Sequence, residues 1–114
     1  MHEVMAAQGV LSAIIAEAEK QKARPVAARI SCGMLNAIND EAFSFAFEAI
    51  AKGTVCEDVK MTVEHKAIQG RCRGCKATFE FEIHKPGCPR CGADNFELLP
   101  DAPLLLEEIE FETG

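Results

Sequence analysis

Two segments of the chain carry hydrophobic residues at the spacing of an amphipathic helix. The first spans residues 4–22, and Pro25 ends it because proline cannot continue a helix. The second lies within NAINDEAFSFAFEAIAKG, residues 36–53, where Asn39 or Asp40 can cap the first turn and Gly53 can end the last. The residues expected to face a core are Val4, Leu11, Ile14, Ile15 and Ala18 in the first helix, and Phe43, Phe47 and Ile50 in the second.

Three other segments alternate hydrophobic and polar residues as half-buried strands do. They are VAARISCGML at 26–35, VKMTVEHKA at 59–67 and LLLEEIEFE at 104–112. In the last segment Leu105, Ile109 and Phe111 are expected on one face, although Glu107 interrupts that face. A fourth, shorter strand is expected in ATFEFEIH at 77–84.

The order of these elements predicts an α+β (mixed α/β) fold, with two helices packed on a three-stranded sheet. Composition changes at Gly70, where the sequence becomes rich in Cys, Gly and charge until about Leu98. We therefore expect one domain from residues 1–69 and 99–114, interrupted by an inserted domain at 70–98. The last strand is expected to return to the first domain.

The inserted segment contains the strongest motif of the chain. Two CxxC pairs, separated by twelve residues, place four cysteines on two tight turns: Cys72, Cys75, Cys88 and Cys91. Such paired knuckles are typical of a structural zinc ribbon, in which four thiolates fill a tetrahedral site and leave no open position for catalysis. Gly74 and Gly92 are expected to supply the unusual backbone angles of these turns. A thiol oxidoreductase is an alternative, because a CxxC pair can also be redox-active.

The charge and composition of the chain limit the classes of partner that it is expected to bind. The chain has a net charge of −6, and residues 99–114 hold five acidic residues and no basic one. A nucleic-acid-binding zinc ribbon is a second alternative, supported by Arg71, Arg73, Lys76, Lys85 and Arg90 around the knuckles. The acidic tail and the absence of Trp and Tyr argue against it. No apolar run is long enough for a membrane span, and reduced cysteines fit a cytoplasmic protein.

The N-terminus offers a second, different metal site. The α-amine of Met1, the backbone amide of His2 and its imidazole can form fused chelate rings, which suit Ni(II) or Cu(II) in planar nitrogen coordination. The Glu3 amide could complete the plane, and its carboxylate could be an axial or outer-sphere group. Asp40 is expected first as a helix cap and second as a contact of this site. His65 and His84 are expected at the surface or in packing, although His84 could approach the zinc knuckle. Cys32 is expected in the core.

Taken together, Met1-His2-Glu3, the element order and the inserted four-cysteine motif resemble the hydrogenase nickel-incorporation family, HypA/HybF. The resemblance covers essentially the whole chain. It implies a nickel metallochaperone rather than an enzyme, with Zn(II) as a structural ion and Ni(II) as transferred cargo. It also implies that His2 is the key nickel ligand, aided by Met1, Glu3 and Asp40.

The partners that the resemblance implies are a nickel-insertion GTPase and the large subunit of [NiFe]-hydrogenase. Neither nucleic acid nor a membrane is expected as a partner. The chain is expected to be a monomer or a weak or domain-swapped dimer.

Overall fold

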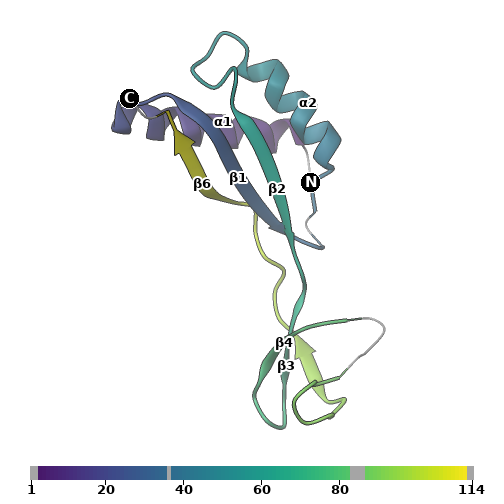
Figure 1. Ribbon diagram of the computed structural model, residues 1–114. Coiled ribbons are helices and arrows are strands. Elements are labelled where there is room, and N and C mark those ends of the chain that lie inside the picture. The colour runs from purple at the N-terminus through teal and green to yellow at the C-terminus, as the bar shows by residue number, and fades with distance from the viewer. Residues whose placement is uncertain (1–2, 36, 83–86, 113–114) are drawn as a thin grey trace.

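The computed structural model describes residues 3–35, 37–82 and 87–112. It contains two helices and six strands in these ranges (Figure 1). Their order and bounds are α1 (Glu3–Gln21), β1 (Pro25–Gly33), α2 (Asp40–Ala51), β2 (Lys60–Lys66), β3 (Gln69–Cys72), β4 (Thr78–Glu80), β5 (Phe96–Leu98) and β6 (Leu105–Phe111). None of the described helices has the length and apolar character needed to cross a bilayer.

The larger sheet has the strand order β2-β1-β6. Strands β1 and β2 run parallel and are joined through α2, whereas β6 pairs antiparallel with the other edge of β1. Both helices lie on the same side of this sheet (Figure 1). The predicted α+β fold of two helices on a three-stranded sheet is therefore confirmed.

Helix α1 buries a narrow stripe of alanine and branched aliphatic residues. Ala7, Val10, Ile14 and Ala18 are buried at intervals of three and four residues. The expected stripe was partly wrong, because Val4 is exposed and Leu11 and Ile15 only border the core. The two helices bring their N-terminal ends to the same edge of the unit (Figure 1).

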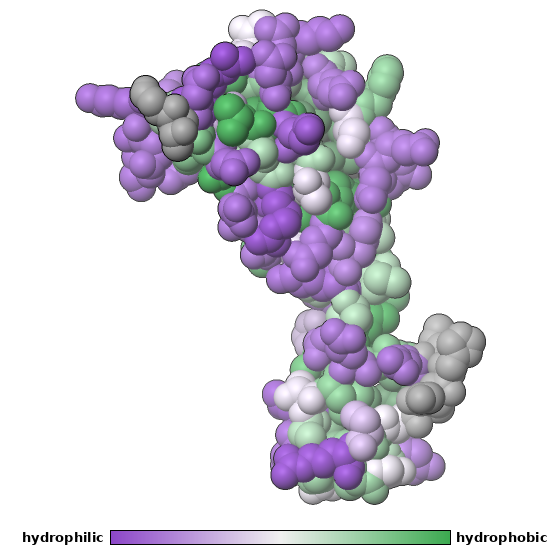
Figure 2. Space-filling model, in the orientation of Figure 1, coloured by the Kyte–Doolittle hydropathy of each residue, from purple (hydrophilic) through white to green (hydrophobic). Residues whose placement is uncertain are grey.

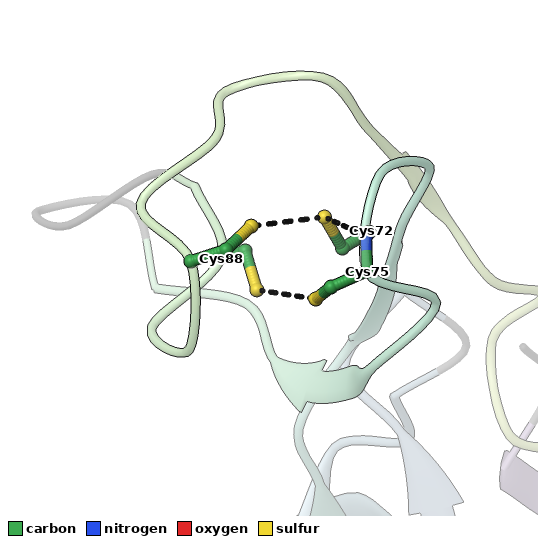
Figure 3. Close-up of side chains that lie close together, drawn as sticks. Cys72, Cys75 and Cys88 are labelled. Atoms are coloured by element: carbon green, nitrogen blue, oxygen red, sulfur yellow. Dashed lines mark hydrogen bonds between the residues drawn. The ribbon is translucent and has the colours of Figure 1, made fainter.

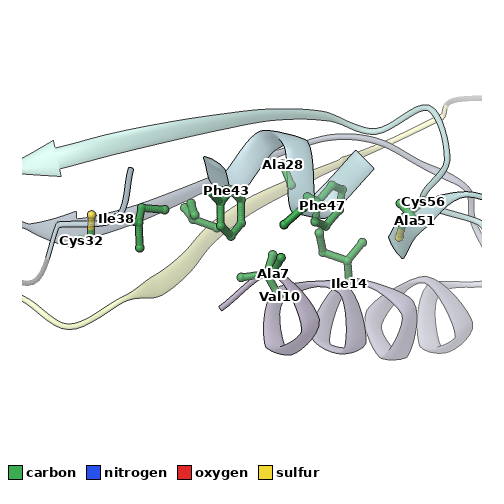
Figure 4. Close-up of a cluster of buried hydrophobic side chains, with 12 residues drawn as sticks. Ala7, Val10, Ile14, Ala28, Cys32, Ile38, Phe43, Phe47, Ala51 and Cys56 are labelled. Carbon is green, nitrogen blue, oxygen red and sulfur yellow. The ribbon is translucent and has the colours of Figure 1, made fainter. Parts of the chain in front are cut away.

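The core lies between the two helices and the sheet (Figure 4). Phe43 and Phe47 of α2 stack with ring centroids 6.1 Å apart, and Phe47 lies over Ile14 of α1. From the sheet, Ile30 and Cys32 of β1 point into the same layer and are completely buried. Gly53 has φ +80°, as expected for the glycine that ends α2.

Strand β6 contains a bulge at Glu107. Arg29 of β1 pairs with Glu108, and the next residue, Ile30, pairs with Leu106, so Glu107 is the extra residue. This shift allows Leu106 and Ile109 to pack against the core although they are three positions apart. The expectation that Leu105 faces the core was wrong, since Leu105 is exposed and Leu106 takes its place.

The face of the sheet away from the helices is charged rather than apolar. Arg29 of β1 pairs with Glu64 of β2 at 2.8 Å and with Glu108 of β6 at 3.4 Å. Glu107 accepts hydrogen bonds from the hydroxyl of Ser31 at 2.6 Å and from the ammonium of Lys66 at 3.1 Å. Polar side chains cover much of the surface in this view (Figure 2).

The smaller sheet has the order β4-β3-β5, with both neighbours antiparallel to β3. Of the strand expected at 77–84, only Thr78–Glu80 forms β4, and Phe81 and Glu82 lie outside it. The chain enters and leaves this unit side by side, because the amide of Leu99 donates to the carbonyl of Gln69 at 2.8 Å. The two sheets give the molecule an extent of 54 × 28 × 17 Å. The division into a domain of 1–69 with 99–114 and a domain of 70–98 stays a prediction.

Candidate metal centres

The four cysteines of the two CxxC motifs meet at one point of the smaller unit (Figure 3). Their sulfur atoms all lie within 4.8 Å of one another. Cys72 Sγ is 3.5 Å from Cys91 Sγ, and Cys75 Sγ is 3.5 Å from Cys88 Sγ, so each contact joins one knuckle to the other. Among the described residues, this is the one cluster of His, Cys, Asp and Glu side chains that is compact enough to hold a metal ion.

The two knuckles have the same backbone hydrogen bonds. The amide of Cys72 donates to the carbonyl of Ala77 at 2.9 Å, and the amide of Cys88 donates to the carbonyl of Ala93 at 2.9 Å. The loops are therefore two copies of one turn, facing each other across the sulfur atoms. Cys72 and Cys88 are buried, and they form the small core of the unit together with Phe79.

The residue after each CxxC pair closes the turn. The amide of Lys76 donates to Cys72 O at 3.0 Å, and the amide of Gly92 donates to Cys88 O at 2.8 Å. Both residues have positive φ, 67° for Lys76 and 75° for Gly92. The expected backbone angle is confirmed at Gly92 but was wrong at Gly74, because Lys76 rather than Gly74 has the left-handed conformation in the first knuckle. The amide of Gly74 nevertheless hydrogen-bonds the sulfur of Cys72 and helps to lower the pKa of that thiol.

The thiols have unequal proton affinities. The backbone amide of Cys75 is the main cause that lowers the pKa of Cys72 to about 6, and the amide of Cys91 is the main cause that lowers the pKa of Cys88. The amide of Ala93 lowers the pKa of Cys91, but hydrogen bonds from Cys72 and the other thiols outweigh it and raise that pKa to about 11. Cys72 and Cys88 therefore lose their protons readily, and the negative charge of these thiolates opposes deprotonation of Cys91.

This donor set fits a structural zinc ion. Four sulfur atoms around Zn(II), each about 2.3 Å from it, would stand about 3.8 Å apart in a tetrahedron. The two sulfur contacts of 3.5 Å are close to that spacing. A divalent cation also offsets the repulsion that keeps the last thiol protonated, so binding the ion would complete the ionisation of the cluster.

The N-terminal site is described only in part, because Met1 and His2 lie outside the described residues. Glu3 is the first residue of α1, and its Oε1 accepts a hydrogen bond of 3.0 Å from the backbone amide of Asn39. This contact joins the start of α1 to the start of α2.

Asp40 lies at the same corner and has a partner that the sequence did not predict. Asn39, not Asp40, caps α2, because Asn39 Oδ1 accepts from the amide of Ala42 at 2.9 Å. Asp40 is the first helical residue, and its Oδ1 is 2.7 Å from Nε2 of His65 on β2. His65 was expected as a surface or packing residue. One sequence feature could have indicated that His65 faces the helices: it continues the alternation of Met61 and Val63, which face the core.

The remaining candidate residues are two further cysteines and one histidine. Cys32 is fully buried, as expected, and its Sγ is 3.5 Å from Nδ1 of His65. Cys56 is also fully buried, and this burial raises the pKa of its thiol. His84 lies outside the described residues, so its expected approach to the zinc knuckle stays a prediction.

Comparisons with known proteins agree over the whole chain. The family model for "Hydrogenase/urease nickel incorporation, metallochaperone, hypA" matches residues 1–111. The hydrogenase maturation factor HypA of Desulfitobacterium hafniense (strain DSM 10664 / DCB-2) is 33% identical and is aligned over 98% of this chain and 99% of its own. The factor of the same name from Prosthecochloris aestuarii is 30% identical, over 98% of this chain and 100% of its own.

Two solution structures share the fold. One, of a HypA protein, has a TM-score of 0.71 at 20% identity and covers 98% of this chain and 97% of its own. The other, of the Ni metallochaperone HypA from Helicobacter pylori, has a TM-score of 0.65 at 20% identity and 97% coverage of both chains. The fold, the four-cysteine cluster and the family match agree, and the chain belongs to the HypA family of hydrogenase/urease nickel-incorporation metallochaperones.

Proposed function

We propose that this chain binds Ni(II) at its N-terminus and delivers it to the large subunit of a [NiFe]-hydrogenase together with a nickel-insertion GTPase. The proposed nickel ligands are His2 and the backbone nitrogens around Met1 and Glu3, with Asp40 as a further contact. Family membership supports the nickel cargo. The relatives of this chain are named as hydrogenase maturation factors, which favours hydrogenase over urease as the recipient.

The observation that carries this assignment is the hydrogen bond from the Asn39 amide to Glu3 Oε1. It joins Glu3, the residue after His2, to Asn39, the residue before Asp40, although the two segments are far apart in the sequence. The bond also engages one oxygen of the Glu3 carboxylate, which favours an outer-sphere role for this carboxylate and leaves the backbone nitrogens to the metal. Planar nitrogen donors of this kind suit Ni(II).

We assign a different task to the four cysteines. Cys72, Cys75, Cys88 and Cys91 are the proposed ligands of a permanent zinc ion, which stabilises a unit with too few buried residues to fold unaided. A closed sulfur site holds its metal tightly, whereas a site at the chain terminus can release it. The two metals are thus separated by ligand type and geometry rather than by affinity alone.

The remaining proposals follow from this role. The chain itself catalyses no reaction, acts in the cytoplasm, and works as a monomer or a weak or domain-swapped dimer. Neither nucleic acid nor a membrane is its partner. The thiol oxidoreductase and nucleic-acid hypotheses find no support in the family match.

Transfer of labelled nickel tests the proposed function. The zinc-loaded chain is charged with radioactive Ni(II) and mixed with nickel-free hydrogenase large subunit, the GTPase and GTP. We expect label to reach the large subunit faster than from free Ni(II) at the same concentration in the presence of a competing chelator. Equal rates with and without the chain would overturn the proposal.

A further inference from the structure

His65 connects the buried core to the corner that holds Glu3 and Asp40. It pairs in register with Cys32 on the parallel strand β1, so the two side chains share the face of the sheet that the helices cover. Both residues lie near the carboxyl ends of β1 and β2. The first residue of α2, Asp40, lies opposite them, and its carboxylate contacts the ring.

Each ring nitrogen of His65 has a separate partner. Nε2 is 2.7 Å from Asp40 Oδ1, and because a carboxylate oxygen only accepts, the Nε2–H donates this bond. Nδ1 then faces the thiol of Cys32 at 3.5 Å and can accept from it. Cys32 has no exposed surface, so the ring is anchored on its inner side. The His65 side chain as a whole is 31% exposed, and its Nε2 reaches Asp40.

We infer that His65 is a positioning residue of the nickel site, acting through Asp40. Its bond fixes Oδ1 of the carboxylate and leaves the second oxygen, Oδ2, for the metal. Carboxylates that ligate metals are commonly oriented by such a hydrogen bond, and loss of the partner typically lowers metal affinity about 10–100-fold. This inference rests on the proposed function, since it takes Asp40 as a contact of the nickel ion.

The position of Asp40 explains why such a partner is needed. The aspartate is the first residue of its helix, and its side chain is 55% exposed. An exposed carboxylate samples several rotamers, and the entropy of ordering it would oppose metal binding. Because Cys32 holds the His65 ring against the core, the ring orders the Asp40 carboxylate before the metal binds. This lowers the entropy cost of metal binding. The neighbouring Asn39 is fixed by its own contacts, to Glu3 and Ala42.

The test compares Ni(II) affinity in the zinc-loaded full chain and in variants at His65. We expect His65→Ala to weaken nickel binding about 10-fold or more. His65→Gln should recover most of the loss, because the glutamine amide can donate from a place close to that of Nε2. Zinc content and the thermal unfolding midpoint of each variant are measured alongside, as is the absorption of the bound nickel.

A double-mutant cycle identifies the route of the effect. If His65 acts through Asp40, then His65→Ala should cause no further loss of nickel affinity in an Asp40→Ala background. Wild-type affinity in His65→Ala, or an equal loss in both backgrounds, would overturn the inference. In either case a loss of nickel in His2→Ala would leave the proposed function standing. Absence of nickel binding by the wild-type chain would instead overturn the proposed function.

Discussion

Lys76 and Gly92 occupy equivalent positions in the two cysteine knuckles, and both adopt the left-handed backbone conformation, with φ of 67° and 75°. Each amide closes its turn on the carbonyl of the first cysteine. The two knuckles therefore require the same backbone geometry but meet it with different residues. Only glycine adopts this geometry without a steric cost.

The first prediction follows from this pair. Gly92→Ala should destabilise the zinc-bound unit by about 1 kcal/mol, because alanine is disfavoured at positive φ. A Cβ at Gly92 would meet no atom within 4 Å, so the cost would come from the backbone and not from a clash. Lys76→Gly is the matched control and should cause no such loss. Competition for zinc with a chelator measures the zinc affinity of both variants. A Gly92→Ala variant with wild-type zinc affinity would contradict the prediction.

Removal of zinc should unfold one part of the chain and spare the other. Among the described residues, the hydrophobic core of the smaller unit consists of Cys72, Phe79 and Cys88, two of which are proposed ligands, whereas the core of the larger unit has twelve buried residues. We expect a chelator to collapse the dispersed amide resonances of residues 70–98 while those of α1, α2 and β1 persist. Loss of all dispersed resonances would contradict this and also the proposed division into two domains.

Glu107 should make stability depend on pH. The hydroxyl of Ser31 first, and the ammonium of Lys66 second, lower the pKa of Glu107 below its ordinary value of 4.5. The ionised carboxylate therefore stabilises the fold fully above pH 4.5, and this contribution is lost as pH falls through the lower folded-state pKa. The difference in unfolding free energy between wild type and Glu107→Gln should be constant from pH 7 to about 5 and should shrink below that.

Chemical unfolding at several pH values checks this prediction. Glu110→Gln is the matched control, since Glu110 lies on the same strand and makes no side-chain hydrogen bond or ion pair with the described residues. The control should track the wild type at every pH. A Glu107→Gln variant whose difference from wild type grows on acidification would contradict the prediction, because the sign would be reversed.

The sequence predicted the main architecture because its signals were local. Helical spacing, alternation and the paired CxxC motifs each lie within a few residues, and they sufficed for the two helices, the three-stranded sheet and the cysteine cluster. Residues that depend on pairing between distant strands were missed. Leu106 rather than Leu105 faces the core because the bulge at Glu107 shifts the alternation, and only the register with β1 reveals it.

The contrast between local patterns and long-range pairing also explains which parts of the candidate sites could be predicted from the sequence. Spacing alone brought the four cysteines together, because a zinc ribbon is encoded in a short segment. The contact between Asp40 and His65 joins residues 25 apart, and it depends on the parallel pairing of β1 and β2. Sequence analysis expected His65 at the surface or in packing, and its contact with Asp40 could be found only after α2 had been placed over the sheet.

The central claim is that nickel binds through His2, apart from a zinc ion held by the four cysteines. It is tested most directly by metal analysis of the wild type and His2→Ala after dialysis against Ni(II). We predict about one Ni(II) and one Zn(II) per wild-type chain, and in His2→Ala the zinc retained with the nickel lost. A His2→Ala variant that keeps nickel at wild-type affinity would contradict the account.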